Sequence, residues 1–220
     1  MRQPTYKSTR LLISVAFLKL LLHFITNNQL LGYGYFRDEF YYLVCAERLD
    51  FGYVDHPPLA PFLLSINHQL LGDSIFALRL LPGFAGAVTV FLTGLMARQL
   101  GGGKFAQMLA PLAITIAPVH LVINGFFSPN AFEALLWTAS TCVLLSLLKQ
   151  DNPQLWLWIG LIAGIGLQMK HTMILFGLGM LFGLLLTSAR KHLRSKWPVS
   201  YTHLRAHETR HDLVCRLLLE

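Results

Sequence analysis

The stretch LLISVAFLKLLLHFITNNQLL, from Leu11 to Leu31, decides the fold. About twenty residues of helix cover the roughly 30 Å of hydrocarbon in a bilayer, and Lys19 and His23 are its ionisable residues. Basic residues precede it, as they precede a signal peptide: Arg2, Lys7 and Arg10. The stretch is too long for the apolar part of a signal peptide and has no Ala-x-Ala site. It predicts a retained signal-anchor helix.

The composition excludes an ordinary soluble domain. Hydrophobic residues make up 54% of the 220 residues and charged residues 13%, with a mean hydropathy of +0.51. Soluble domains carry about a quarter charged residues. The three cysteines, Cys45, Cys142 and Cys215, form no CxxC pattern, so they indicate neither a disulfide framework nor a zinc site. The composition therefore predicts an integral membrane protein.

Further apolar stretches follow the first, at residues 74–98, 105–127, 131–148 and 155–186. The last would be about 48 Å long as one helix, which is too long for a single crossing. Because Lys170 and His171 interrupt it, we expect two spans there. The fold class predicted is all-α, a polytopic transmembrane bundle of about six spans.

The segment between the first two spans, GYGYFRDEFYYLVCAERLDFGYVDHPPL from Gly32 to Leu59, is aromatic and acidic. Its tyrosines and phenylalanines are typical of the membrane interface. We expect one interfacial helix over residues 38–50 and a second over residues 58–71, stopped by Gly72. Three apolar residues of the first helix are expected to face inward: Phe40, Leu43 and Val44.

The net charge of +7 has a distribution that favours membrane orientation over nucleic-acid binding. Six spans place both ends of the bundle's sequence on one side. That side holds ten basic residues: Arg2, Lys7, Arg10, Arg98, Lys104, Lys149, Arg190, Lys191, Arg194 and Lys196. The other side holds four: Arg37, Arg48, Arg79 and Lys170. The positive-inside rule then predicts a cytoplasmic N-terminus at residues 1–10 and an acidic loop that faces outward.

The sequence changes character after the membrane domain, which we assign to residues 11–197. Residues 198–220 are polar and rich in histidine, with no spanning segment. They are either a cytoplasmic tail or, as we expect, foreign sequence at the end of the reading frame. The spacing of His203, His207 and His211 therefore does not indicate a functional site.

Two motifs of the outer loop carry groups that suit catalysis. Five of the 11 acidic residues fall between residues 38 and 55. Asp38 and Glu39 open the first interfacial helix, where carboxylates serve as a general base, as metal ligands or simply as helix-capping charge. Asp55 and His56 precede two prolines that fix the backbone, which suits either a binding site or a rigid junction.

Polar residues of the later spans are predicted to lie at the same outer edge. Lys170 and His171 either pair with a lipid phosphate or snorkel to the interface. Asn130 and Glu133 begin the fourth span, and Glu133 on an apolar helix is expected to face either protein or a polar cavity. Together with Arg79 and the loop residues, they form the pattern expected of a site for a charged lipid headgroup.

Four stretches carry a resemblance to a known family: GYFRDEFYYLVCAERLDFGYVDHPPL, RLLPGFAGAVTV, FFSPNAFEALLW and GLIAGIGLQMKHTMILFG. In this order the chain resembles bacterial members of the protein O-mannosyltransferase and aminoarabinose-transferase superfamily, which have the membrane-embedded GT-C fold. The resemblance covers about residues 11–197. Because the family is typically about twice this length, it implies an N-terminal fragment that we expect to be inactive alone.

The resemblance implies a sugar donor on a polyprenyl phosphate and an acceptor hydroxyl on a lipid, glycan or protein, at the outer face of the bacterial cytoplasmic membrane. Asp38 would be the general base, with Glu39 completing the acidic pair. Asp55 and His56 match a position where relatives often carry an acid followed by Lys, so His56 would hold the phosphate. Lys170 would neutralise the leaving phosphate.

The remaining implied features are less specific. Asn130 stands where many relatives have Asp, and Arg79 and His171 complete the expected substrate-binding set. Some relatives bind a divalent metal, but the residues here form no ligand set specific for one. Two other classes stay open from the residues alone: a membrane transporter, which predicts polar groups at mid-membrane depth in an inverted repeat, and a non-catalytic assembly protein.

Overall fold

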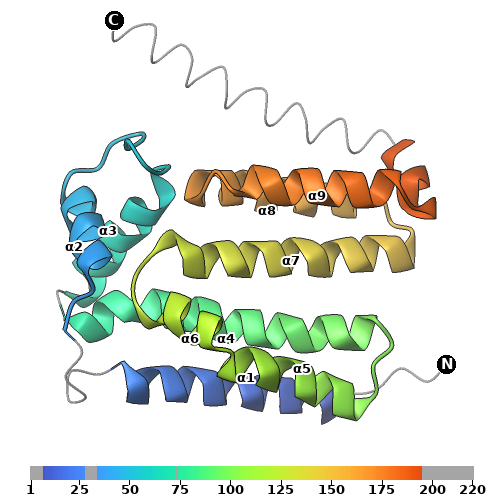
Figure 1. Cartoon of the computed structure of the whole chain (residues 1–220), viewed down its shortest axis with the longest axis horizontal. Coiled ribbons are helices and arrows are strands. Elements are labelled where there is room, and N and C mark those ends of the chain that lie inside the picture. Colours follow the sequence, from blue (N-terminus) through green and yellow to red (C-terminus); the bar gives the residue numbers. More distant parts are fainter. Residues whose placement is uncertain (1–6, 28–33, 73, 195–220) are drawn as a thin grey trace, which may run out of the picture.

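The computed structural model describes residues 7–27, 34–72 and 74–194, and every regular element in this part of the chain is a helix. This confirms the all-α fold class. The helices are α1 (Lys7–Thr26), α2 (Arg37–Glu47), α3 (Leu59–Leu71), α4 (Ile75–Gln99), α5 (Lys104–Ile116), α6 (Pro118–Gly125), α7 (Pro129–Gln150), α8 (Leu155–Met169), α9 (Met173–Leu185) and the 3₁₀ helix η2 (Ser188–Arg194). Figure 1 shows the long helices side by side with α2 and α3 across one end.

The helices α1, α4 and α7 are long and apolar enough to cross a membrane, and the bent pair α5–α6 makes a fourth candidate. The predicted break at Lys170 and His171 is present, because α8 ends at Met169 and α9 begins at Met173. These two apolar helices have 15 and 13 residues, about 22 and 20 Å at 1.5 Å per residue. Each is shorter than the hydrocarbon core, so the count of six spans is not confirmed.

The span expected over residues 105–127 consists of two helices with a break between them. Helices α5 and α6 meet at an angle of 56°. Proline disfavours helical geometry in the residue before it and has no N–H for the helix ladder. Ala117, directly before Pro118, is accordingly extended, with ψ at 124°.

Helix α4 lies between α1 and α5–α6 on one side and α7 on the other (Figure 1). Its two ends are tied to α1, which runs antiparallel to it. Arg98 donates to the Thr9 hydroxyl at 3.1 Å, and His23 bonds the backbone oxygen of Arg79 at 2.9 Å. At Gly83 the His23 ring lies so near the α4 backbone that a Cβ atom would be 2.3 Å from it. The α1–α4 contact thus depends on the glycine.

Both helices predicted in the outer loop are present. They cross the end of the bundle where α1 ends and where α4 and α7 begin (Figure 1). Gly72, with φ at 76°, ends α3 as expected. The inward orientation expected for Phe40 and Val44 is wrong, because both are exposed, whereas Leu43 packs against the core. The face of α2 that is buried is the one that carries Glu39.

The end that carries α2 and α3 has an apolar core of its own. Its buried residues come from α2, α3, α4, the α6–α7 junction and α8: Ala46, Ala60, Leu64, Leu78, Ala85, Phe127, Phe132 and Met169. The ends of α4 and α7 that carry Arg98 and Lys149 lie at the opposite end of the bundle (Figure 1). Arg98 and Lys149 therefore lie at the end opposite Asp38 and Glu39 of α2, as the predicted topology requires. The orientation in the membrane, and the domain limits at residues 10 and 197, stay predictions; the tail lies outside the described residues.

Candidate functional site

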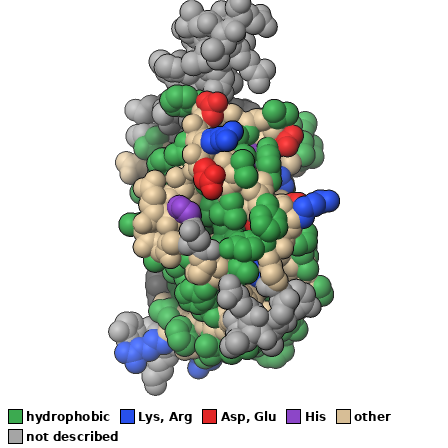
Figure 2. Space-filling model, turned by 90° about the vertical axis from the view of Figure 1, so that its left-hand side faces the viewer, with side chains coloured by type: hydrophobic (Ala, Val, Ile, Leu, Met, Phe, Trp, Pro, Cys, Tyr) green, Lys and Arg blue, Asp and Glu red, His purple; other side chains and the backbone are tan. Residues whose placement is uncertain are grey.

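All eight residues predicted from the sequence belong to segments at the α2–α3 end of the bundle. Asp38 and Glu39 are in the first turn of α2, and Asp55 and His56 lie between α2 and α3. The others lie near the start of α4 (Arg79), at the start of α7 (Asn130) and in the break between α8 and α9 (Lys170 and His171). Figure 2 views this end, where acidic, basic and histidine side chains stand among apolar ones.

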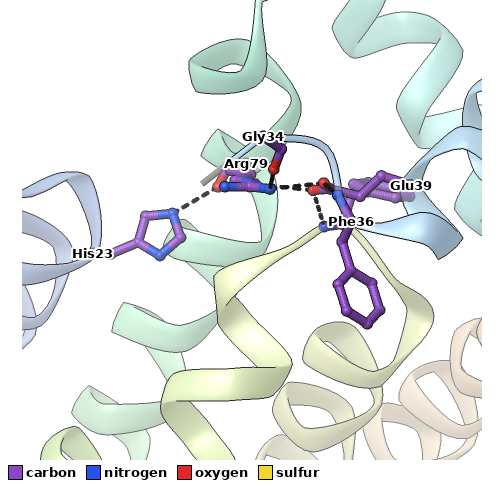
Figure 3. A network of polar contacts seen from close by, with 6 residues as sticks. His23, Gly34, Phe36, Glu39 and Arg79 are labelled. Carbon is purple, nitrogen blue, oxygen red and sulfur yellow. Dashed lines mark hydrogen bonds and ion pairs between the residues drawn. The ribbon is translucent and has the colours of Figure 1, made fainter. Parts of the chain in front are cut away.

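Glu39 and Arg79 form a buried ion pair at the base of this end (Figure 3). Two parallel bonds join them: Nε to Oε1 at 3.0 Å and Nη2 to Oε2 at 2.8 Å. The side chains are 0% and 4% exposed. The Glu39 carboxylate also accepts from the backbone N–H of Phe36 at 2.7 Å and of Phe127 at 2.9 Å. A buried charge needs this degree of pairing to be tolerated.

The pair joins segments that are far apart in the sequence. Through Phe127, Glu39 holds the turn between α6 and α7, and through Phe36 it closes the first turn of α2. Arg79 also donates to the backbone oxygen of Gly34 at 2.8 Å. The imidazole of His23, on α1, forms a hydrogen bond with the backbone carbonyl of Arg79 (Figure 3). The start of α2 is therefore fixed from α1, α4 and the α6–α7 turn.

Asp38 has a different environment from its neighbour. Its side chain is 44% exposed, and its Oδ1 accepts a bond of 3.2 Å from the Nε of Arg37. The charge lies at the N-terminus of α2, where the helix dipole favours an anion. The negative charge of Asp38 also affects the hydroxyl of Tyr42. Burial is the main cause that raises the pKa of Tyr42 to about 12, and the charge of Asp38 is the next. Asp38 is thus a partly exposed carboxylate, whereas its neighbour Glu39 is buried.

His56 is enclosed by aromatic rings and is only 5% exposed. The ring centroids of Tyr41, Tyr42 and Tyr53 lie 5.4, 5.1 and 4.9 Å from that of its imidazole. Its Nδ1 bonds the carbonyl of Pro57 at 3.0 Å, while Nε2 is buried and has no hydrogen-bond partner in the described part of the chain.

Asp55 is exposed beside this aromatic group. Burial, followed by the charges of Cys45 and Asp55, raises the pKa of the Tyr41 hydroxyl, which places Asp55 close to Tyr41. The Tyr53 hydroxyl donates to the carbonyl of Cys45 at 2.9 Å and accepts from the N–H of Asp50 at 3.1 Å. The loop that carries Asp55 and His56 is thus fastened to α2.

Lys170 lies in a second polar group at the same end. Its Nζ donates to Asn130 Oδ1 at 2.7 Å and to Glu133 Oε2 at 2.8 Å, and its side chain remains 34% exposed. The Thr172 hydroxyl donates to the other oxygen of Glu133. His171 is exposed beside them. Asn130, Glu133 and Thr172 thus hold the lysine head at the surface.

Aromatic packing connects the two polar groups. Tyr42 contacts Phe127, and Phe127 contacts Phe132, with ring centroids 5.9 and 5.7 Å apart. Phe132 precedes Glu133, and Met169, which precedes Lys170, belongs to the same buried core. An open hollow of about 480 Å³ lies where Leu59 packs against this core, and none of the eight predicted site residues lines it. Its lining residues are Leu49, Asp50, Phe51, Pro58, Leu59, Phe62 and Gln168. Its volume falls in the range of small-molecule sites.

No group of three or more His, Cys, Asp or Glu side chains in the described residues is arranged to hold a metal ion. Asp38, Asp55 and His56 are spread around Tyr41 and Tyr42 and do not form a ligand set. The donor groups in the described part of the chain therefore do not fit a metal ion.

Several residues of this end were not foreseen as partners. The three tyrosines around His56 and the hydroxyl of Thr172 were not predicted. Glu133 was expected to face either protein or a polar cavity, without a stated partner. A carboxylate and a lysine that both interrupt apolar spans were a usable signal for the pair of Glu133 and Lys170, since buried charges are generally paired. The tyrosines follow no spacing that would have indicated them.

A comparison of the chain with protein families gives a match. The family described as dolichyl-phosphate-mannose-protein mannosyltransferase matches residues 55–206, more than half of the 220 residues. No curated protein matches the chain. No solved structure matches it either.

Proposed function

Because the chain belongs to the dolichyl-phosphate-mannose-protein mannosyltransferase family, a family of glycosyltransferases that use lipid-linked donors, we propose that it transfers a sugar from a polyprenyl phosphate to a hydroxyl. The acceptor is a lipid, glycan or protein. Transfer takes place at the outer face of a bacterial cytoplasmic membrane, with the N-terminus of the chain in the cytoplasm. The charge distribution between the two ends of the bundle supports this orientation.

The observation that carries the proposal is the difference between Asp38 and Glu39. Glu39 is buried and fully occupied by Arg79 and two backbone N–H groups, so it positions its neighbour and does not react. Asp38 stands next to it on a fixed helix turn with its side chain 44% exposed. A base must be held in place and yet be reachable by the acceptor, and Asp38 meets both conditions.

The chemistry follows from these positions. Asp38 takes the proton of the acceptor hydroxyl as its oxygen attacks the anomeric carbon of the donor sugar. The bond from that carbon to the phosphate oxygen breaks, and its electron pair leaves with the lipid phosphate. We assign Lys170 to the phosphate, because its head is partly exposed and a cation stabilises the charge that develops there.

The other predicted residues support these two. Arg79 acts through Glu39, and Asn130 holds the Lys170 head. Asp55, His56 and His171 lie around the same end and are assigned to substrate binding. Of these, Asp55 and His171 are exposed and offer polar groups to the acceptor or the donor head.

The class of donor can be tested directly. Because the chain is expected to be inactive alone, the test uses membranes that contain it joined to the C-terminal half that the family resemblance implies. These membranes would be supplied with a radiolabelled sugar on a polyprenyl phosphate or with the same sugar on a nucleotide, and label in alcohol acceptors would be counted. We expect transfer from the lipid-linked sugar. Equal transfer from the nucleotide sugar, in membranes that cannot make the lipid-linked form, would disprove the assignment of the donor.

A further inference from the structure

The hydrogen bond between His56 and Pro57 determines which nitrogen of the imidazole carries the proton. A backbone carbonyl only accepts hydrogen bonds, so Nδ1, at 3.0 Å from the Pro57 oxygen, is the donor. In the neutral ring the other nitrogen then has a lone pair. Nε2 is thus a hydrogen-bond acceptor, and it is buried without a partner among the described residues.

The surroundings hold the ring in this orientation. Tyr41 and Tyr42 of α2 and Tyr53 of the loop enclose it, and Tyr53 is itself bonded to the backbone of Cys45 and Asp50. The two prolines that follow His56 restrict the carbonyl that Nδ1 bonds. Rotation of the ring would give up that bond, so Nε2 stays the free acceptor.

An acceptor nitrogen selects the chemistry of its partner. The oxygens of a sugar phosphodiester are anionic and only accept hydrogen bonds, so they cannot pair with a neutral Nε2. A hydroxyl donates, and a buried acceptor without a partner discriminates strongly for a group that supplies the proton. The neighbouring Asp55 carboxylate and the exposed ring of Tyr41 offer a second acceptor and an aromatic face.

We propose that Nε2 of His56 binds a substrate hydroxyl, on the donor sugar or on the acceptor, and that His56 is therefore a specificity residue and not a phosphate ligand. This rests on the proposed function, because it presumes a sugar substrate at this end of the bundle. In this proposal each of three residues contacts a different group of the substrates. Lys170 contacts the phosphate, Asp38 contacts the reacting hydroxyl, and His56 contacts a hydroxyl that does not react.

The tautomer is tested by nitrogen NMR of the detergent-solubilised chain labelled with ¹⁵N-histidine. Comparison with the His56→Gln variant identifies the His56 signals among the nine histidines. We expect the proton on Nδ1, and a shift of the Nε2 signal when polyprenyl phosphate mannose is added. A proton found on Nε2 would overturn the proposal.

Binding of three probes tests the ligand: polyprenyl phosphate mannose, the same polyprenyl phosphate without the sugar, and octyl mannoside as a stand-in for the acceptor. Replacing His56 by Phe should weaken the binding of the sugar-bearing lipid about tenfold, which is the free energy of one hydrogen bond to a buried acceptor expressed as affinity. His56→Gln, which keeps an acceptor oxygen, should retain most of the affinity, and His56→Lys should not. The sugar-free lipid should bind all four proteins equally, which also shows that the variants are folded.

The other outcomes are distinguishable. If the Phe and Gln variants no longer bind the sugar-free lipid and the Lys variant does bind it, His56 contacts the phosphate. That result would overturn this proposal but not the proposed function. Unchanged binding of the sugar-bearing lipid by the Phe variant, together with unchanged binding of octyl mannoside, would also overturn it. If only octyl mannoside loses affinity, the hydroxyl belongs to the acceptor and the proposal stands. If neither lipid binds the unaltered chain, the proposed function fails as well.

Discussion

At the scale of single residues, Asp38 and Glu39 show how burial separates two adjacent carboxylates. Successive residues of a helix point about 100° apart, so one side chain of the pair enters the core while the other stays at the surface. The sequence predicted the acidic pair correctly as a feature of the helix start. It could not divide the roles, because the partner that buries Glu39 is Arg79, forty residues later.

The buried pair should be sensitive to the loss of either charge. Glu39→Ala leaves the Arg79 guanidinium unpaired in the core, and we expect a loss of about 3–5 kcal/mol of stability. Thermal unfolding in detergent measures it, with Glu47→Ala, an exposed residue of the same helix, as the control. The double change of Glu39 and Arg79 to Leu should destabilise less than Glu39→Ala. Equal melting of the Glu39 and Glu47 variants would contradict the account.

Lys170 should contribute to the affinity for the lipid phosphate. Its replacement by Met removes a charge-assisted hydrogen bond, and we expect binding of polyprenyl phosphate to weaken about tenfold to a hundredfold. The uncharged polyprenol should bind the variant as before. Lys149→Met, at the opposite end of α7, is the matched control. If Lys170→Met binds polyprenyl phosphate as tightly as the unaltered chain does, Lys170 does not bind the donor phosphate.

At the scale of elements, the helices with strong local signals were predicted to within a few residues of their bounds. The apolar stretches at residues 74–98 and 131–148 predicted α4 and α7. The stretch at residues 155–186 was too long for one span, which predicted the break at Lys170. The break at Pro118 was missed because length and hydropathy were weighed without the proline. The inward face of α2 was wrong because a buried ion pair, rather than apolar residues, decides which side of that helix is covered.

The close contact of α1 and α4 should tolerate no side chain at Gly83. A Cβ there would lie 2.3 Å from the His23 ring, so Gly83→Ala should lower the melting temperature and loosen the bond to the Arg79 carbonyl. At Gly164 of α8 a Cβ meets nothing within 4 Å. Gly164→Ala should therefore be neutral or gain up to about 1 kcal/mol from helix propensity. The same response at both sites would show that the helices do not meet as described.

At the scale of the whole molecule, the candidate site is assembled from five segments that meet at one end of the bundle. The predicted topology placed these residues on one face, since every second crossing returns there. It could not predict which side chains touch, because bonds such as those of Glu39 to Phe127 and of Lys170 to Asn130 depend on packing between distant helices.

The same topology predicts which end faces outward. In a variant without native cysteines, Glu47→Cys and Lys149→Cys place single thiols at opposite ends of the bundle. A maleimide that does not cross membranes should label the thiol at residue 47 in intact cells and the thiol at residue 149 only after lysis. The reverse pattern would put the site on the cytoplasmic side.

The most direct test of the central claim is sugar transfer by the Asp38→Asn variant. Membranes would contain the chain joined to the C-terminal half that the family resemblance implies, either unaltered, with Asp38→Asn or with the control Glu47→Gln. They would receive a labelled polyprenyl-phosphate sugar and an alcohol acceptor. Removal of a general base typically costs 10²- to 10⁴-fold in rate, so the Asp38 variant should lose about that much while the Glu47 variant transfers normally. Undiminished transfer by the Asp38→Asn variant would contradict the account, because no carboxylate at this position would then be needed.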